Sequence, residues 1–213
     1  MDRQAARAVM TAVLHAAPHI VSCLGGICPV FAQGSAASSL RQLQALSAAA
    51  PMPAAMRPLH VALAGGNAVT VFSKTAAEWV PLWDAVVAPH YLLPGLVVES
   101  WLHGPGRMPS HCGGSACVLN NLRVRLPQRT AFGVMQDHSK WAVGCGSAQP
   151  TVLCFGDHNR EAGQLRRGGT AVCFAGQSAA EVELYDWFAG IVDPERVCTG
   201  CACHALPPVR ALV

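Results

Sequence analysis

The chain has 213 residues, of which 52% are apolar and 13% are charged, so it can form the core of one domain of ordinary size. It contains no run of about 18 apolar residues, which argues against a membrane-spanning helix. Net charge is +3, and residues 123–167 hold seven basic but only three acidic side chains. This basic segment favours a polyanion as partner, although a solvated basic face explains it about equally well.

The amino-terminal quarter predicts few regular elements. Residues 1–14 combine basic side chains with a brief apolar patch, but no small-residue cleavage site follows, so we do not expect a signal peptide. A helix or strand fragment is expected around residues 19–23. Leucines at near-helical spacing predict a short helix over residues 39–46.

A hairpin and a helix are predicted next. Apolar runs at residues 59–63 and 68–72, joined by Gly65-Gly66-Asn67, form the hairpin pattern. Thr75-Ala76-Ala77-Glu78 has the form of a capping box and opens the predicted helix. Pro81 should distort the second turn of that helix. Its expected buried residues are Trp79, Trp83, Val86 and Val87.

Strands dominate the remainder of the chain. Apolar and alternating patterns predict strands over residues 95–102, 117–126, 132–135, 151–155 and 170–174. Ser178-Ala179-Ala180-Glu181 is a second capping box, and the helix after it should present one apolar face formed by Leu184, Trp187, Phe188 and Ile191. The predicted fold is therefore an α/β or α+β sandwich, in which helices flank a mixed β-sheet.

The strands over residues 132–135 and 151–155 would bring three polar side chains to one edge of the sheet. His138 and Lys140 are two residues apart, so on a strand they share a face. Lysine supplies positive charge, imidazole can transfer a proton near neutral pH, and Asn159 can donate a hydrogen bond to a phosphate oxygen. These residues predict a phosphate site, although a solvated strand end with a satisfied histidine is the simpler interpretation of the three residues alone.

Three ordered segments extend this pattern: Asp137-His138-Ser139-Lys140-Trp141, Cys154-Phe155-Gly156-Asp157-His158-Asn159-Arg160 and Arg167-Gly168-Gly169-Thr170-Ala171-Val172-Cys173. Together they closely resemble the carboxyl-terminal signature of the deoxyribonuclease II family. Weaker similarity includes Phe72-Ser73-Lys74 and residues 18–21 and 101–112. The resemblance implies a phospholipase D-like fold. It also implies that residues 1–213 form a single domain that lacks the family's amino-terminal half.

The resemblance further implies an endonuclease that hydrolyses DNA at acidic pH without a metal or other cofactor. In that family two His-x-Lys motifs meet at one site, where one histidine attacks phosphorus and the other protonates the leaving oxygen. His138 matches the second motif and is implied to be the general acid, while Lys140 and Asn159 hold phosphate oxygens. The expected substrate contacts are Asp157, His158, Arg160, Arg166 and Arg167.

The chain contains a single His-x-Lys, because none of the other eight histidines has a lysine two residues later. One explanation is that the chain is a fragment of a longer precursor with the first motif. Another is a homodimer in which each copy supplies one His138 across a two-fold interface. The third is a catalytically inactive DNA-binding or decoy module, whose affinity for DNA would depend on salt.

Ten cysteines suggest an oxidising compartment, and the resemblance implies a lysosomal or secreted location that the amino-terminal segment does not itself support. The resemblance also implies two disulfides, Cys112–Cys198 and Cys154–Cys173. The second would bracket the Arg- and Gly-rich loop over residues 160–169, called the basic loop below. The other six cysteines, including Cys145 and Cys203, have no partner in the family pattern.

A zinc site is the alternative role for the cysteines near the carboxyl terminus. Four potential ligands lie within seven residues: Cys198, Cys201, Cys203 and His204. No second Cys-x-x-Cys of standard spacing accompanies them, and Cys198 is needed for the implied disulfide. We therefore expect no metal.

Overall fold

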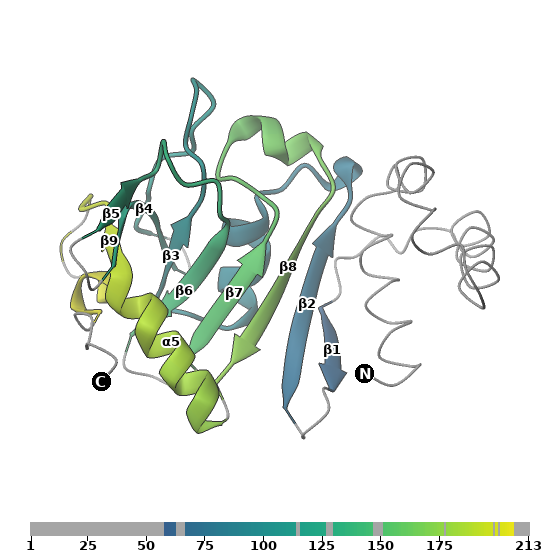
Figure 1. The fold of residues 1–213 in the computed structure, drawn as a ribbon. Helices are drawn as coiled ribbons and strands as arrows, with labels where there is room; N and C mark the ends of the chain where they lie inside the picture. The colour runs from purple at the N-terminus through teal and green to yellow at the C-terminus, as the bar shows by residue number, and fades with distance from the viewer. Residues whose placement is uncertain are drawn as a thin grey trace, which may run out of the picture.

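The computed structural model describes residues 58–62, 67–113, 116–126, 130–146, 151–176, 178–197, 199 and 201–206. Its strands form one sheet in the order β1-β2-β8-β7-β6-β3-β4-β5, and β9 pairs with the second half of β4 (Figure 1). The strands are β1 Leu59–Ala62, β2 Ala68–Lys74, β3 Gly95–Glu99, β4 Cys117–Arg125, β5 Ala131–Gly133, β6 Trp141–Cys145, β7 Val152–Gly156, β8 Gly169–Ala175 and β9 Val192–Pro194.

The sheet is mixed, as the sequence predicts. Among the described strands, β3 and β4 run parallel, while the other pairs are antiparallel. The predicted hairpin is present as β1 and β2, with Ala62 opposite Ala68, and its turn residues 63–66 lie outside the described residues. The elements predicted around residues 19–23 and 39–46 also lie outside them.

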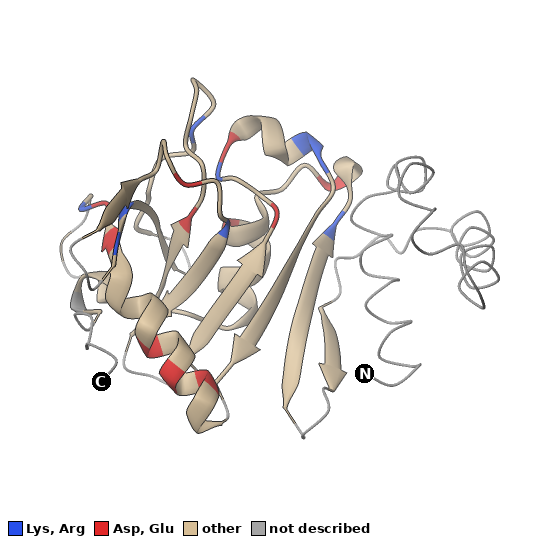
Figure 2. Cartoon of the chain, viewed as in Figure 1, with Lys and Arg blue, Asp and Glu red and all other residues tan. Residues whose placement is uncertain are grey.

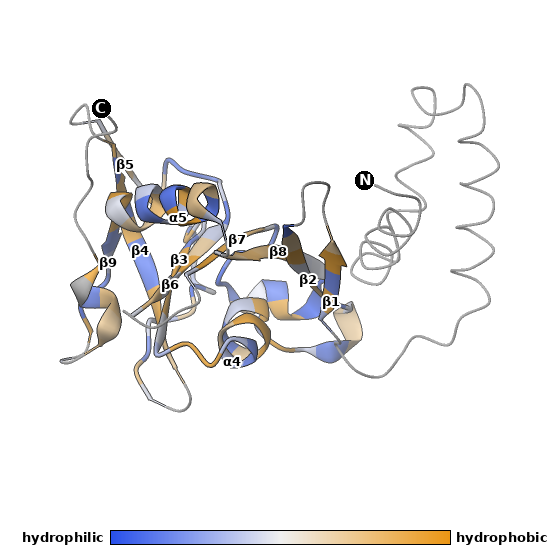
Figure 3. Cartoon of the chain, turned by 90° about the horizontal axis from the view of Figure 1, so that it is seen from below, coloured by the Kyte–Doolittle hydropathy of each residue, from blue (hydrophilic) through white to orange (hydrophobic). Residues whose placement is uncertain are grey.

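Helices cover both faces of the sheet, which makes the fold α+β in kind (Figures 1 and 3). On one face lie the π-helix η2 (Leu82–Val87) and its continuation α4 (Ala88–His90), with Trp83 buried against the sheet. On the other face lies α5 (Ala179–Ile191). Because successive strand residues point to opposite faces, Val98 packs in the first layer and Val97 in the second. Three short 3-10 helices complete the described elements: η1 Ala76–Glu78, η3 Ala162–Arg166 and η4 Ala202–Ala205.

The helix predicted after the first capping box is wrong in extent. The capping box is present, but it opens only η1, after which Trp79 adopts a left-handed conformation with a φ of 40°. Pro81 lacks a backbone donor, and helical structure resumes only at Leu82. Trp79 is therefore 57% exposed and not part of the core. The other three predicted core residues are buried: Trp83, Val86 and Val87.

The strand that reaches His138 and Lys140 is also different from the prediction. β5 ends at Gly133, and the chain re-enters the sheet as β6, a strand that the sequence patterns did not predict. Residues 137–140 form the loop that leads into β6, so His138 and Lys140 do not lie on a strand. They still reach the sheet edge, because β6 begins directly after Lys140.

The apolar face of α5 is rotated from the predicted one. Its capping box is present, and the Ser178 side chain accepts a hydrogen bond from the backbone N–H of Glu181. Leu184, predicted to be buried, is 42% exposed, and Tyr185 takes the buried position instead. The Tyr185 hydroxyl donates to the carbonyl oxygen of Gly144 at 2.7 Å, which satisfies its polar end and ties α5 to β6.

Disulfides fasten the described elements. Cys154–Cys173 joins β7 to β8, as the resemblance implied, with a Cα–Cα distance of 4.0 Å. Cys145–Cys203 joins β6 to η4, a bridge that the family resemblance did not imply. Cys112 is also disulfide-bonded, and its implied partner, Cys198, lies outside the described residues.

Candidate active site

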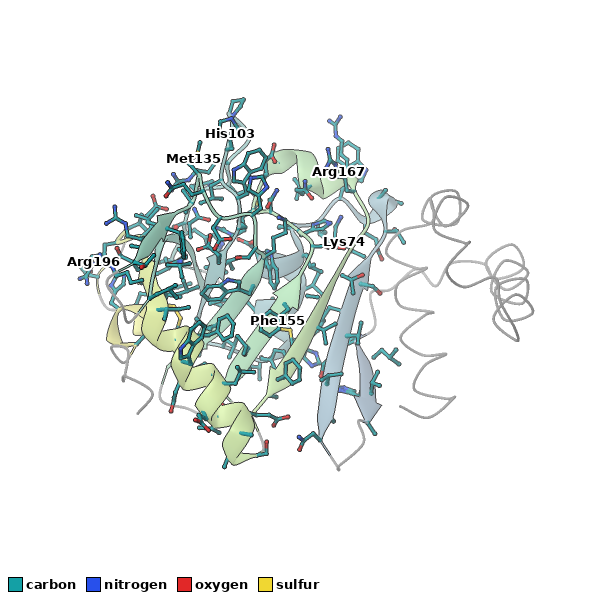
Figure 4. All side chains as sticks on the ribbon, viewed as in Figure 1. Lys74, His103, Met135, Phe155, Arg167 and Arg196 are labelled. Carbon is teal, nitrogen blue, oxygen red and sulfur yellow. A yellow bond between two sulfur atoms is a disulfide. The ribbon has the colours of Figure 1, made fainter. Side chains whose placement is uncertain are left out.

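The predicted site residues lie along one edge of the sheet. β3 and β7 end there, at Glu99 and Gly156, and β6 and β8 begin there, at Trp141 and Gly169. His103, Met135 and Arg167 project from the same edge (Figure 4). Lys and Arg side chains occur along it, interspersed with acidic ones, whereas α5 carries three acidic and no basic side chains (Figure 2). The edge thus offers an anion positively charged partners that α5 lacks.

Trp101 contacts two of the three predicted catalytic residues, and the third, Lys140, contacts the backbone of His138. Its ring stacks on the His138 ring, with 4.3 Å between centroids and 24° between planes, and it also stacks with His103 at 5.0 Å. Its backbone N–H donates to Oδ1 of Asn159 at 3.2 Å. Lys140 Nζ donates to the backbone carbonyl of His138 at 2.6 Å. The structure therefore brings His138, Lys140 and Asn159 together around one tryptophan.

Glu99, the last residue of β3, is a buried carboxylic acid close to this group. It is 1% exposed and pairs across the sheet with Trp141. Asn121 Nδ2 donates to its Oε2 at 2.5 Å, while Oε1 has no hydrogen-bond partner among the residues that the structure describes. Burial raises the pKa of Glu99 to about 8, with a smaller contribution from Asp137. In acid Glu99 is therefore uncharged and does not neutralise the nearby Lys140.

His158 lies inside the loop that follows β7. It is 3% exposed, and its Nε2–H donates to the carbonyl of Gly168 at 2.9 Å. A Cβ at position 169 would lie 2.0 Å from this ring, so Gly169 makes room for it. Burial lowers the pKa of His158, which favours the neutral imidazole. These contacts fix the loop; the substrate contact expected of His158 stays a prediction.

Arg160 is a buried cross-link. Its Nη2 and Nε bind the two carboxylate oxygens of Asp84 at 2.6 and 3.2 Å, and its Nη1 donates to Oδ1 of Asn120 at 2.5 Å. Nη2 also donates to the carbonyl of Pro109 at 3.1 Å. All three guanidinium nitrogens thus bind protein groups and join η2, β4 and the loop after β3. Its expected substrate contact also stays a prediction.

The other expected contacts are exposed. Asp157 accepts the backbone N–H of Thr170 at 2.9 Å, which closes the base of the basic loop. The Arg166 guanidinium lies 4.5 Å from the ring centroid of the exposed Trp79, a cation–π arrangement. Arg167 is exposed beside it. Both arginines can therefore meet a ligand from solvent.

Lys74 binds the backbone of the basic loop from the end of β2. It is fully buried at the end of β2, and its ammonium donates to the carbonyls of Leu165, at 3.2 Å, and Arg167. Burial lowers the pKa of Lys74, while Glu78 and Asp157 oppose that shift. No role was predicted from the sequence for Lys74, Glu99 or Trp101. Glu99 and Trp101 both lie in the segment predicted as a strand over residues 95–102, of which residues 95–99 form β3.

The proposed zinc ligands do not remain together as thiolates. Cys203 is disulfide-bonded to Cys145, which removes it as a ligand. Cys198, Cys201, Cys203 and His204 therefore cannot bind one zinc ion as a set of four.

None of the described helices combines the length and the apolar character that a membrane span requires.

A family model described as Deoxyribonuclease II matches residues 9–188. The chain is 38% identical over 100 residues to Cell-death-related nuclease 7 of Caenorhabditis elegans, covering 46% of this chain and 26% of that protein. It is 39% identical over 80 residues to Deoxyribonuclease-2-alpha of Mus musculus, covering 37% and 22%. It is 33% identical over 117 residues to Plancitoxin-1 of Acanthaster planci, covering 55% and 32%. The chain thus spans between 22% and 32% of the length of these three relatives.

Proposed function

This chain belongs to the deoxyribonuclease II family, and on that premise we propose that it hydrolyses DNA phosphodiester bonds at the edge that holds His138, Lys140 and Asn159. The observation that supports this most is the grouping of these three residues around Trp101. They come from two separate loops, and the ring and backbone N–H of Trp101 contact His138 and Asn159, while Lys140 contacts the backbone of His138. A phosphate placed there meets a cation, an amide donor and an imidazole.

Each of the three residues has a distinct part in the proposed reaction. Lys140 supplies positive charge to a non-bridging phosphate oxygen. Asn159 uses Oδ1 to accept from Trp101, and this orients its amide so that Nδ2 is the donor toward phosphate. His138 gives a proton to the leaving oxygen. Arg166 and Arg167 attract the DNA backbone before the chemical step.

The proposed activity is independent of metal and greatest in acid. An imidazole can donate a proton only from its protonated form, so acid favours a general-acid histidine. Acid also keeps Glu99 neutral, since the pKa of this buried carboxyl is raised to about 8. The neutral Glu99 then does not compete with the phosphate for the positive charge of Lys140.

The group that attacks phosphorus comes from outside the His138 loop. Because the chain has a single His-x-Lys, we propose that a second copy supplies the other histidine across a two-fold interface. Sizing of the protein by sedimentation, alone and with DNA, tests this part. A dimer is expected under cutting conditions, and a monomer that cuts would contradict it.

Plasmid nicking tests the hydrolysis itself. Wild-type protein in excess EDTA at acidic pH should convert supercoiled plasmid to the nicked form. His138→Ala and Lys140→Ala should cut more slowly by roughly a hundredfold or more, as for loss of a general acid or a charge stabiliser. His60→Ala, which removes an exposed histidine on β1, is the matched control and should cut like the wild type. Equal rates for His138→Ala and wild type would rule the proposal out.

A DNA-binding module without catalysis is the second candidate, and the single His-x-Lys is what favours it. Such a protein binds DNA with an affinity that falls steeply with salt, and it never nicks the plasmid. Binding measured at several salt concentrations, together with the nicking assay on the same preparation, separates the two functions.

A further inference from the structure

A group of sulfur atoms lies at the edge of the sheet opposite the candidate active site. Cys117 begins β4, Gly95 begins β3 beside it, and Cys145 ends β6 on the other side of Gly95. The segment 201–203 packs over these strand ends. Its Cys203 is bonded to Cys145, and the sulfur of Cys203 lies 2.5 Å from where a Cβ on Gly95 would stand. Glycine at position 95 therefore allows the segment to approach the sheet.

The same approach brings Cys201 to Cys117. Both are free thiols, their sulfur atoms lie within 4.8 Å of each other, and they share a hydrogen bond. The sulfur of Cys112 is within the same distance, but Cys112 is already disulfide-bonded and offers no thiolate. Cys201 is buried, with 7% of its surface exposed, whereas Cys117 is half-buried. The two thiols thus differ in access to solvent.

We propose that Cys117 and Cys201 are a redox-active thiol pair that closes into a further disulfide and fixes η4 onto the start of β4. Two described disulfides already join β7 to β8 and β6 to η4, which favours a disulfide-forming environment for this protein. Metal binding fits the pair less well, because structural zinc takes four ligands and the described residues supply two free thiols here.

The difference in exposure sets the order of the two steps. The thiolate of Cys117 attacks a low-molecular-weight disulfide such as oxidised glutathione, which forms a mixed disulfide and releases one glutathione thiolate. The thiolate of Cys201 then attacks the Cys117 sulfur, forms the Cys117–Cys201 bond and releases the second glutathione thiolate. The two protons lost by the cysteines end on the two glutathione molecules. Two protein thiols are oxidised, and one glutathione disulfide is reduced.

The test treats the full chain with oxidised glutathione at mildly alkaline pH, because burial and the adjacent Cys201 thiol raise the pKa of Cys117. The protein is then quenched in acid, unfolded, alkylated and mapped by peptide mass. In the wild type both thiols should lose alkylation together, and a peptide pair linked through Cys117 and Cys201 should appear with two hydrogen atoms fewer.

Two variants test the order of events. Cys201→Ser should stop at a glutathione adduct on Cys117, whereas Cys117→Ser should leave the buried Cys201 open to alkylation after unfolding. An intact Cys154–Cys173 disulfide in each map shows that the variant has folded. Wild-type thiols that both stay alkylatable, or a new link between Cys117 and Cys112, would overturn the proposal. Protection of both thiols by Zn²⁺ alone would replace it with a metal site.

Discussion

Glu99 couples the candidate site to pH through its burial. Its ordinary pKa is 4.5, and in the folded protein it is raised to about 8. Between these values the unfolded chain has lost the proton while the folded chain still holds it. The free energy of unfolding therefore falls as the pH rises from about 4.5 to about 8, by at most roughly 5 kcal/mol.

Glu99→Gln should remove this pH dependence. Glutamine cannot ionise, and its side-chain oxygen can still accept from Asn121. We expect the variant to match the wild type near pH 5 and to be more stable by up to roughly 5 kcal/mol near pH 8. Urea unfolding at a series of pH values measures this, with the exposed Glu183→Gln as control. Parallel curves for Glu99→Gln and wild type would show that the carboxyl ionises freely in the folded state.

Asp84 and Arg160 form the buried ion pair on which the loop after β7 depends. Asp84→Ala leaves the Arg160 guanidinium buried without its carboxylate, so we expect a loss of about 3–5 kcal/mol in the free energy of unfolding. The matched control is Asp193→Ala, which breaks an exposed pair with Arg125 and should cost less than about 1 kcal/mol. Urea denaturation compares the two variants, and similar losses in both would contradict a structural role for Arg160.

At the level of elements, the Cys154–Cys173 disulfide fixes the two strands that carry the basic loop between them. The double variant Cys154→Ala/Cys173→Ala removes a cross-link between residues 19 positions apart. The chain-entropy model gives a loss of about 3 kcal/mol for a loop of this length. Thermal unfolding should show the loss, and an unchanged midpoint would mean that strand pairing alone holds the loop.

Sequence patterns predicted most of the sheet but missed β6. Full burial alone does not hide a strand, because β3 is also buried throughout and its Leu-Val-Val run was predicted. The β6 sequence Trp-Ala-Val-Gly-Cys includes an alanine and a glycine, which are depleted in strands, so its pattern is weaker. Trp79 was misplaced for a different reason. Its left-handed backbone ends η1 before Pro81, so the predicted helix does not continue through Trp79 and its ring is not turned into the core.

The site could be predicted in part. A local motif identified His138, Lys140 and Asn159, because their types and spacing carry the chemistry. The contacts that hold them could not be found this way, since Glu99 and Trp101 come from the end of β3 and the loop after it, and Arg160 pairs with a carboxylate 76 positions away. Such contacts depend on sheet topology, which short-range patterns do not encode.

On the scale of the whole molecule, the exposed arginines of the basic loop should govern the affinity for DNA. Replacing both Arg166 and Arg167 with alanine removes two exposed charges from the loop, so the dependence of log affinity on log salt should become less steep by about two. Arg196→Ala is the matched control, because Arg196 is exposed on the far side of the molecule from Arg167 (Figure 4). Binding isotherms at several salt concentrations measure both slopes. Equal slopes for the double variant and the control would place DNA elsewhere.

The central claim is that His138 protonates the leaving oxygen of a DNA phosphodiester, and the leaving group itself offers the most direct measurement. An oligonucleotide with sulfur in place of a bridging oxygen has a leaving group that needs little protonation, and both bridging positions are tested in turn. The cleavage rate of His138→Ala relative to wild type should recover on one of these substrates, while Lys140→Ala stays slow on both. Failure of His138→Ala to recover on either substrate, with wild type cutting both, would contradict the assignment.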